Sequence, residues 1–207
     1  MRIAVVDYGM GNVRSVSKAL EHVAPQAQVL VTHDPEAIRG AERVVVPGQG
    51  AMPDCMRQLA ASGAREAVIE ATRGKPFLGL CIGMQMLFER GEEGPAEGLG
   101  LLEGSVPRFP TGGTMAGLKV PHMGWNRVLR SRSHPLWDGI EDGARFYFVH
   151  SYFAQPADES LTAARCEYGV TFTCAVARDN IFAVQFHPEK SQSAGLQLLS
   201  NFVRWLP

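Results

Sequence analysis

The feature that most constrains the fold is the alternation of short apolar runs with helical patterns in the first half of the chain. The apolar runs, which predict buried strands, lie at residues 2–7, 28–32, 43–47 and 76–80. The helical patterns lie at residues 12–23, 54–72 and 82–90. Buried strands that alternate with helices are typical of a parallel sheet whose two faces are both covered.

The second half of the chain has a different pattern, in which short strands are separated by turns. A glycine-rich loop is predicted at residues 91–100, and an amphipathic helix at 193–206. The strands predicted between them lie at 104–109, 125–130, 145–149, 161–166, 171–177 and 181–186. We expect these strands to be antiparallel additions beside the parallel core. Because there is no internal repeat or linker, we expect one α/β domain over residues 1–207.

Composition and charge exclude several classes of function. The 207 residues are 45% hydrophobic and carry a formal net charge of −1, so no basic surface for nucleic acid is expected. No apolar run approaches the roughly 20 residues that cross a bilayer. The first run meets Asp7 too early for a signal peptide, so we expect a cytoplasmic protein. The four cysteines form no C-x-x-C pair, and we predict no metal and no cofactor.

One cysteine, Cys81, has a special context, because Gly79 and Gly83 flank it where a strand meets a helix. The pattern G-x-C-x-G follows the logic of the G-x-S-x-G nucleophile elbow, in which a strained turn presents the nucleophile. Unpaired N–H groups at the start of the helix would stabilise a thiolate and an oxyanion. A buried cysteine in a tight turn is the alternative interpretation. We expect the other three cysteines to be small buried hydrophobes.

A cysteine nucleophile needs a general base, and His187 is the best placed of the six histidines. It follows the apolar run NIFAVQF, Pro188 then forces a turn, and Glu189 comes next. This spacing can place an imidazole beside a carboxylate at the carboxyl end of a strand, where open α/β sheets have their active sites. Alone, H-P-E is a weak signal, but with Cys81 it completes a Cys–His–Glu set.

A second glycine-rich turn follows the strand at 43–47, where Gly48, Gln49 and Gly50 stand in succession. Glycines allow a peptide plane to rotate and to direct an N–H group at a ligand. This turn is therefore a candidate for binding an oxyanion. By itself it would be interpreted as a simple strand–helix connection.

Together, the motifs P-G-x-G, G-x-C-x-G-M-Q and H-P-E resemble those of the class I, triad-type glutamine amidotransferases, in the same order along nearly the whole chain. The resemblance implies the fold of that family and hydrolysis of the side-chain amide of L-glutamine. Cys81 would attack the amide carbon, and His187 would pass a proton to the leaving ammonia. Glu189 would hold the imidazole, and water would then hydrolyse a γ-glutamyl thioester.

Longer stretches resemble one branch of this family, the glutaminase subunits of imidazole glycerol phosphate synthase. These stretches are DYGMGNVRSV at 7–16, KVPHMGWN at 119–126, FYFVHSYF at 146–153 and HPEKSQSAGLQLLSNF at 187–202. The resemblance implies a heterodimer with a cyclase subunit, a (β/α)₈ barrel that receives the ammonia in histidine biosynthesis.

Carried over by position, the resemblance also implies roles for individual residues. The residues that would bind glutamine are Gln85, Ser151 and Tyr152. Those that would form the oxyanion hole are Gly48, Gln49, Gly50 and Ile82. Those that would face the cyclase are Asn12, Met123, Trp125, Asn126, Tyr147 and Lys190. Valine is frequent in the family at the position of Gln49, so only a backbone role is carried over there.

Two alternatives stay open at the level of the sequence. One is the glutaminase of another amidotransferase, such as anthranilate or pyridoxal phosphate synthase, and the stretches GWN and HSYF argue against it. The other is a catalytically silent regulatory module of the same fold. The intact Cys81, His187 and Glu189 argue against that.

Overall fold

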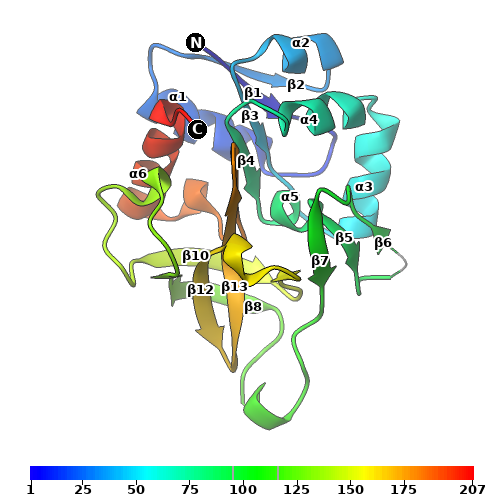
Figure 1. Cartoon of the computed structure of the whole chain (residues 1–207), viewed down its shortest axis with the longest axis vertical. Helices are drawn as coiled ribbons and strands as arrows, with labels where there is room; N and C mark the ends of the chain where they lie inside the picture. The colour runs from blue at the N-terminus through cyan, green and yellow to red at the C-terminus, as the bar shows by residue number, and fades with distance from the viewer. Residues whose placement is uncertain (95, 116) are drawn as a thin grey trace.

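The computed structural model describes residues 1–94, 96–115 and 117–207 (Figure 1). Within them an eight-stranded sheet forms the centre, in the order β2-β1-β3-β4-β14-β13-β12-β9. Its strands are β1 (Arg2–Val6), β2 (Gln28–Thr32), β3 (Arg43–Val46), β4 (Phe77–Leu80), β9 (Leu129–Arg130), β12 (Thr162–Tyr168), β13 (Val170–Arg178) and β14 (Ile181–Val184). The helices are α1 (Val13–Val23), α2 (Pro35–Gly40), α3 (Met52–Ala61), α4 (Arg65–Ala71), α5 (Ile82–Gln85) and α6 (Gln192–Arg204).

Two smaller sheets, one of two strands and one of four, accompany the central sheet. In the first, β8 (His122–Arg127) pairs antiparallel with β10 (Arg145–His150). The second has the order β11-β7-β5-β6, with β5 (Phe88–Gly91), β6 (Ala96–Glu97), β7 (Leu102–Val106) and β11 (Gln155–Pro156). Short 3₁₀ turns lie at Gly113–Met115, Pro135–Trp137, Glu159–Leu161 and Pro188–Lys190. Part of the loop predicted at 91–100 is therefore strand, and its Pro95 lies outside the described residues.

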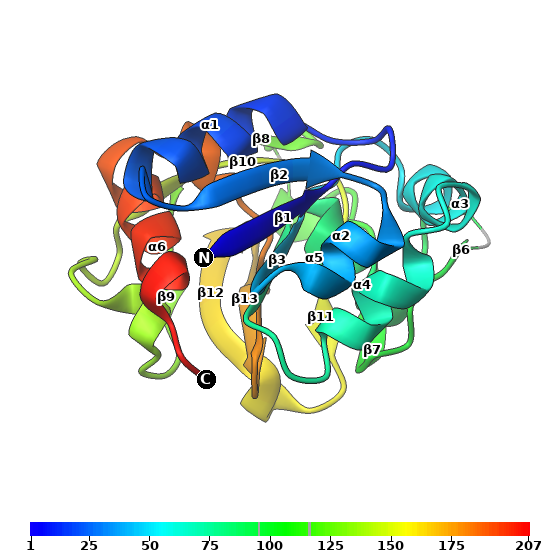
Figure 2. The same cartoon turned by 90° about the horizontal axis from the view of Figure 1, so that it is seen from above.

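The apolar runs are explained by helices on both faces of the central sheet (Figure 2). In β1, Ile3 and Val5 face the side covered by α1 and α6, whereas Ala4 and Val6 face the side covered by α2, α3 and α4. All four side chains are buried. A strand buried on both faces has no polar alternation, which is why these runs are continuously apolar. The predicted covered parallel sheet is confirmed.

Four strands differ from their prediction. The strand predicted at 125–130 is divided between β8 and β9, which lie in different sheets. The strand predicted at 104–109 corresponds to β7, which pairs parallel with β5 as well as antiparallel with β11. β2 was expected to be buried, but it is the edge of the sheet, and Val31 is 44% exposed. β14 was expected among the antiparallel additions, but it pairs parallel with β4, from Ile181 opposite Phe77 to Val184 opposite Leu80. Its other neighbour, β13, is antiparallel. β14 thus ends at the same edge of the sheet as β3 and β4.

Two predicted helices are shorter than expected. The helix predicted at 54–72 is two helices, because Gly63 adopts a φ of +77° between α3 and α4. The helix predicted at 82–90 ends at Gln85, and Phe88 begins β5 opposite Leu102. Met84, Met86, Leu87 and Phe88 are all fully buried, so this segment has no polar face from which a helical period could be judged.

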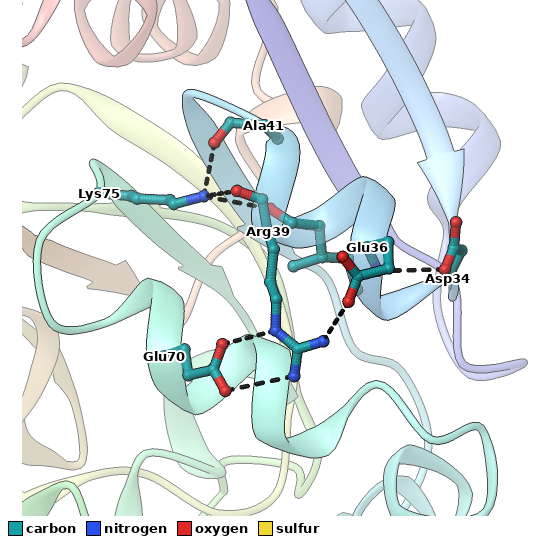
Figure 3. A network of polar contacts seen from close by, with 7 residues as sticks. Asp34, Glu36, Arg39, Ala41, Glu70 and Lys75 are labelled. Atoms are coloured by element: carbon teal, nitrogen blue, oxygen red, sulfur yellow. Dashed lines mark hydrogen bonds and ion pairs between the residues drawn. The ribbon is translucent and has the colours of Figure 1, made fainter.

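Helix α2 was not predicted, although its capping signals are local (Figure 3). The Asp34 carboxylate accepts the N–H of Glu36, and Pro35 stands at the first helical position. Arg39 then bridges Glu36 and Glu70 with nitrogen–oxygen distances of 2.7 Å each. Lys75 donates to carbonyls at the end of α2, which fixes α2 to α4 and to the loop before β4.

No helix in the described part of the chain is long and apolar enough to cross a membrane.

Candidate active site

A cavity of about 290 Å³ lies at the carboxyl ends of β3, β4 and β14. The residues that line it are Gln49, Gly50, Cys81, Ile82, Gln85, Glu93, Pro121, Val149, His150, Ser151, Tyr152 and His187. One of the motifs that the sequence singled out follows each of the three strands, directly after β3 and β4 and two residues after β14. This is the edge at which open α/β sheets bind their ligands.

Cys81 occupies a strained turn between β4 and α5. Its φ is +54° and its ψ is −108°, a conformation that residues with a side chain rarely adopt. The flanking glycines are required by packing, because a Cβ on Gly79 would lie 2.7 Å from the Gly83 carbonyl oxygen. A Cβ on Gly83 would lie 1.9 Å from the Val46 carbonyl oxygen. The predicted nucleophile-elbow geometry is therefore present.

His187 and Glu189 form a buried pair beside Cys81. The Nδ1 atom of His187 lies 2.9 Å from Oε1 of Glu189, and the two side chains are 3% and 1% exposed. Because a carboxylate accepts, Nδ1 carries the proton, and Nε2 is the atom left to exchange a proton with Cys81. Nε2 has no hydrogen-bond partner among the described residues.

The environment of His187 favours its charged form. Burial lowers the pKa of His187, but negative charge on the neighbouring Cys81 and the hydrogen bond to Glu189 together raise it to about 10. A protonated imidazole beside a thiolate is the arrangement that activates a cysteine nucleophile at neutral pH.

The glycine-rich turn after β3 contributes Gln49 and Gly50 to the cavity wall, and Ile82 faces it from the start of α5. Gly48 is not in the wall. A Cβ on Gly48 would lie 2.7 Å from Cβ of Ile82 and 2.8 Å from the hydroxyl oxygen of Tyr8, so this glycine permits close packing. The Tyr8 hydroxyl also donates to the Pro47 carbonyl at 2.7 Å, which anchors the start of the turn.

The end of the cavity opposite the turn is formed by Gln85 and by the segment after β10. Gln85 is buried, and its Nε2 donates to the Tyr152 carbonyl at 3.1 Å and to Oε1 of Gln185 at 3.0 Å. Its Oε1 is buried without a partner among the described residues. Because Gln85 lines the cavity, this unpartnered acceptor is available to a donor group of a bound ligand.

Sequence reasoning missed three residues of the site: Gln185, His150 and Glu93. Gln185 Nε2 donates to Sγ of Cys81 at 3.6 Å. A local signal for Gln185 existed, because a residue two before His187 on an extended segment points to the same side. His150 lines the cavity from the end of β10. Glu93 lines it and accepts the Met52 N–H at 2.8 Å.

The residues expected to face a partner lie mainly on one face of the β8–β10 pair. Met123 and Trp125 are 62% and 42% exposed. Trp125 lies opposite Tyr147 with their rings 6.1 Å apart, and Nζ of Lys190 lies 5.9 Å from the Tyr147 ring. Asn12 precedes α1 as its N-cap residue, and its side chain makes no capping hydrogen bond.

Asn126 is the exception, because it follows Trp125 and so points to the other face. Its Nδ2 donates to the Glu167 carbonyl at 2.8 Å and contacts the His122 ring at 3.3 Å. Its Oδ1 accepts the N–H of Arg127. The amide of Asn126 is thus bound within this chain.

Comparison with known proteins decides the family. The pattern described as "Glutamine amidotransferase class-I" matches residues 4–205. This chain belongs to the class-I glutamine amidotransferases. The "Imidazole glycerol phosphate synthase subunit HisH" of Dechloromonas aromatica is 65% identical to it over 209 residues, covering 99% of this chain and 97% of that protein. The protein of the same name from Aromatoleum aromaticum is 61% identical, covering 99% of each chain.

Identity at this level over the full length confirms the branch of the family that the four longer stretches indicated. Among solved structures, "Structure of PurLQS from Thermotoga maritima" superimposes with a TM-score of 0.73 at 20% identity. The superposition covers 100% of this chain and 99% of that one. It confirms the α/β fold predicted for the chain.

Proposed function

We propose that this chain is the glutaminase subunit of an imidazole glycerol phosphate synthase. It hydrolyses L-glutamine to glutamate and ammonia, and it passes the ammonia to a cyclase subunit in histidine biosynthesis. The observation that carries the proposal is the strained Cys81 beside the His187–Glu189 pair, all three at one cavity. The four free cysteines suit a reducing compartment, and the proposal places the reaction in the cytoplasm.

The reaction follows from the charges and positions of these groups. The Cys81 thiolate attacks the amide carbon of glutamine, and the protonated His187 gives its Nε2 proton to the amide nitrogen, which leaves as ammonia. The neutral imidazole then takes a proton from water, which attacks the thioester carbon. Release of glutamate restores the thiolate and the imidazolium. Glu189 keeps the proton of Nδ1 in place through both steps.

Glutamine would be held by the polar groups around the cavity. The unpartnered Oε1 of Gln85 accepts from the amino-acid end of the substrate. Ser151 and Tyr152 line the same wall. The backbone N–H of Ile82 and of the Gln49–Gly50 turn stabilise the oxyanion, and a single missing donor costs about 10²–10³ in rate.

The partner is a cyclase subunit, a (β/α)₈ barrel, which binds the face of the β8–β10 pair that carries Met123, Trp125 and Tyr147. This face holds large exposed apolar groups, and Lys190 adds a cation beside them. Aromatic residues and methionine are enriched at protein interfaces. Asn12 belongs to the proposed contact, whereas Asn126 supports it from the inner face.

The glycine-rich turn offers a way to keep the glutaminase idle until the cyclase is loaded. If the Gln49 peptide points away from the oxyanion at rest, one donor is missing, and contact with the cyclase could rotate it into place. The test compares glutamate release by the chain alone with release in the presence of the cyclase and its ligand. Equal rates would rule out the gate.

Replacement of the nucleophile tests the proposal as a whole. Cys81→Ala should abolish glutamine-dependent turnover, because no other side chain can form the thioester, whereas turnover of the complex with ammonium salts should persist. Cys174→Ala, which removes a thiol buried elsewhere in the core, should retain both activities. Glutamine-dependent turnover by Cys81→Ala, or failure of an electrophilic glutamine analogue to label Cys81 in the wild type, would contradict the assignment.

A further inference from the structure

Two buried histidines of the small β8–β10 sheet have no part in the reaction described above. His122 and His150 lie opposite each other in the strand register, with Nδ1 of His122 2.9 Å from Nε2 of His150. They are 3% and 5% exposed. His122 stacks on Tyr168 with ring centroids 4.0 Å apart, and His150 packs against Phe172 at 5.1 Å. A buried pair of imidazoles needs a defined set of hydrogen bonds to avoid unsatisfied groups.

The contacts of this pair allow one arrangement of protons. Nδ1 of His150 lies 2.8 Å from the Tyr152 carbonyl oxygen, which can only accept, so Nδ1 carries the proton. In a neutral ring Nε2 of His150 is then an acceptor, and Nδ1 of His122 must donate to it. Nε2 of His122 is in turn an acceptor, and Nδ2 of Asn126, at 3.3 Å, donates to it. The hydrogen bonds therefore run in one direction, from β8 to Tyr152.

The surroundings keep both rings neutral, as this chain of bonds requires. Burial lowers the pKa of His122 to about 4. Burial also lowers the pKa of His150 to about 3, where the hydrogen bond to the Tyr152 carbonyl opposes it and the charges of His122 and His187 add to it. A second proton on His150, at Nε2, would face the N–H of His122 Nδ1, so two donors would meet and this hydrogen bond would be lost.

The last acceptor in this series of hydrogen bonds, the Tyr152 carbonyl, belongs to a residue of the cavity wall. The Tyr152 carbonyl accepts from both His150 and Gln85. Gln85 also donates to Gln185, which donates to Cys81. The direction of these bonds leaves Oε1 of Gln85, a residue of the cavity wall, as an acceptor without a partner among the described residues. If the Tyr152 carbonyl lost its donor from His150, the Gln85 amide would lose the fixed point that orients it.

We propose that His122 and His150 are positioning residues for glutamine: their one-directional hydrogen bonds from Asn126 hold the Tyr152 carbonyl, and through it the Gln85 amide, in the geometry that binds substrate. The inference rests on the proposed glutaminase function. It also explains why β8 carries polar side chains on its inner face, beneath the face that holds Met123 and Trp125.

The first test distinguishes the effect of the hydrogen bond that His122 donates to His150 from the effect of the packing of its ring. His122→Phe keeps an aromatic ring in the cluster but removes the donor to His150. His122→Asn loses ring packing but places an amide nitrogen near the position of Nδ1. For the wild type and both variants with the cyclase subunit, we would measure KM and kcat for glutamine, and turnover with ammonium salts.

The expected result is a loss of about five- to tenfold in kcat/KM for glutamine in His122→Phe, mainly through KM. His122→Asn should lose less of its kcat/KM for glutamine than His122→Phe, although we expect it to have the lower thermal stability because it lacks the ring. Turnover with ammonium salts should stay unchanged in both. The matched control is Tyr168→Phe. It removes from the same aromatic cluster a hydroxyl that donates to the Lys119 carbonyl, but it removes no atom of the hydrogen bonds between Asn126 and Tyr152. It should leave KM unchanged. If kcat/KM for glutamine fell more in the less stable His122→Asn than in His122→Phe, the loss would follow stability rather than the missing donor, and the proposal would be overturned.

The second test needs neither a variant nor turnover. The ¹⁵N chemical shifts of the imidazole nitrogens in the wild-type chain distinguish a protonated nitrogen from a bare one. We expect Nδ1 protonated and Nε2 bare in both His122 and His150 at neutral pH. A proton on Nε2 of His150 would reverse the direction of the bonds and overturn the inference. If the chain and cyclase together released no glutamate, the proposed function would fail, whatever tautomers are found.

Discussion

At the scale of single residues, the site depends on a positive charge held out of water. Burial opposes the charged form of His187, whereas negative charge on Cys81 and the carboxylate of Glu189, which also holds the ring, favour it. A charged imidazole is costly to bury alone, as His122 and His150 show by staying neutral in a similarly buried place. The difference is the presence of an anionic neighbour. The same side chain thus has two different roles in one small protein.

The pKa of His187 should therefore fall when Cys81 is replaced. In Cys81→Ala, burial still lowers the pKa, and Glu189 is the only one of the named raising groups that remains. An NMR titration of the His187 ring in the wild type, in Cys81→Ala and in Cys174→Ala checks this. We expect the control to titrate like the wild type, and an unchanged pKa in Cys81→Ala would contradict the ion pair.

The raised pKa also has a consequence for stability. The folded pKa of about 10 lies above the ordinary value of 6.5, so the folded state holds a proton that the unfolded state releases between these values. The resulting stabilisation is fully present below pH 6.5 and is lost as the pH rises through about 10. Thermal unfolding between pH 7 and pH 10 should show a smaller loss of stability for Cys81→Ala than for the wild type. Equal losses would show that the pair does not stabilise the fold.

At the scale of elements, the turn from β4 into α5 depends on how closely it approaches β3. Gly83 packs its backbone against the Val46 carbonyl, and Gly79 packs against Gly83. The turn can therefore present Cys81 next to the residues that follow β3. A helix of ordinary length is not needed, because α5 is held by buried contacts on all sides.

Gly83→Ala should accordingly destabilise the protein and impair glutamine hydrolysis. Its Cβ would lie 1.9 Å from the Val46 carbonyl oxygen, so β3 and α5 must move apart, at a cost of about 3 kcal/mol in the free energy of unfolding. The matched control is Gly74→Ala, where a Cβ meets nothing within 4 Å and which should change stability by less than about 1 kcal/mol. Urea unfolding of the two variants makes the comparison. A Gly83→Ala protein as stable as the control would show that the close approach is not required.

At the scale of the whole molecule, the small β8–β10 sheet packs one face against the aromatic core and exposes the other, which is apolar. Its inner face holds His122, His150 and Asn126, and its outer face holds Met123 and Trp125. A sheet of alternating side chains can serve both sides because neighbouring residues point in opposite directions. The end of β10, with Val149 and His150, lines the cavity, so the strands that would bind the partner also reach the substrate site.

Trp125→Ala should weaken binding of the cyclase subunit by about 30-fold, as expected for loss of a large aromatic contact at the centre of an interface. The stability of the free chain should hardly change, since the side chain is 42% exposed. Val31→Ala removes a similarly exposed apolar group, 44% exposed, from the β2 edge and should not affect affinity. Isothermal titration calorimetry of the three proteins with the cyclase provides the measurement. Equal weakening by both substitutions would argue against this face.

Local patterns predicted most of the central elements correctly, because the periodicity of strands and helices can be recognised from residues close together in the sequence. The break between α3 and α4 had a local signal in the dipeptide Ser62-Gly63, and α2 had one in Asp34-Pro35. The end of α5 had none, since Met84, Met86, Leu87 and Phe88 form a buried apolar run that does not mark where the helix stops. The parallel pairing of β14 with β4 could not be seen either, because pairing joins residues that are distant along the chain.

The sequence by itself determined the pieces whose parts are adjacent: the glycines that force Cys81 into its turn, and the two-residue step that joins His187 to Glu189. Only the tertiary structure decided which pieces meet. The register of β14 on β4 places His187 and Gln185 beside Cys81, and the pairing of β8 with β10 joins His122 to His150. The physical reason is that dihedral preferences act between neighbours, whereas strand register is set by the packing of side chains from the whole chain.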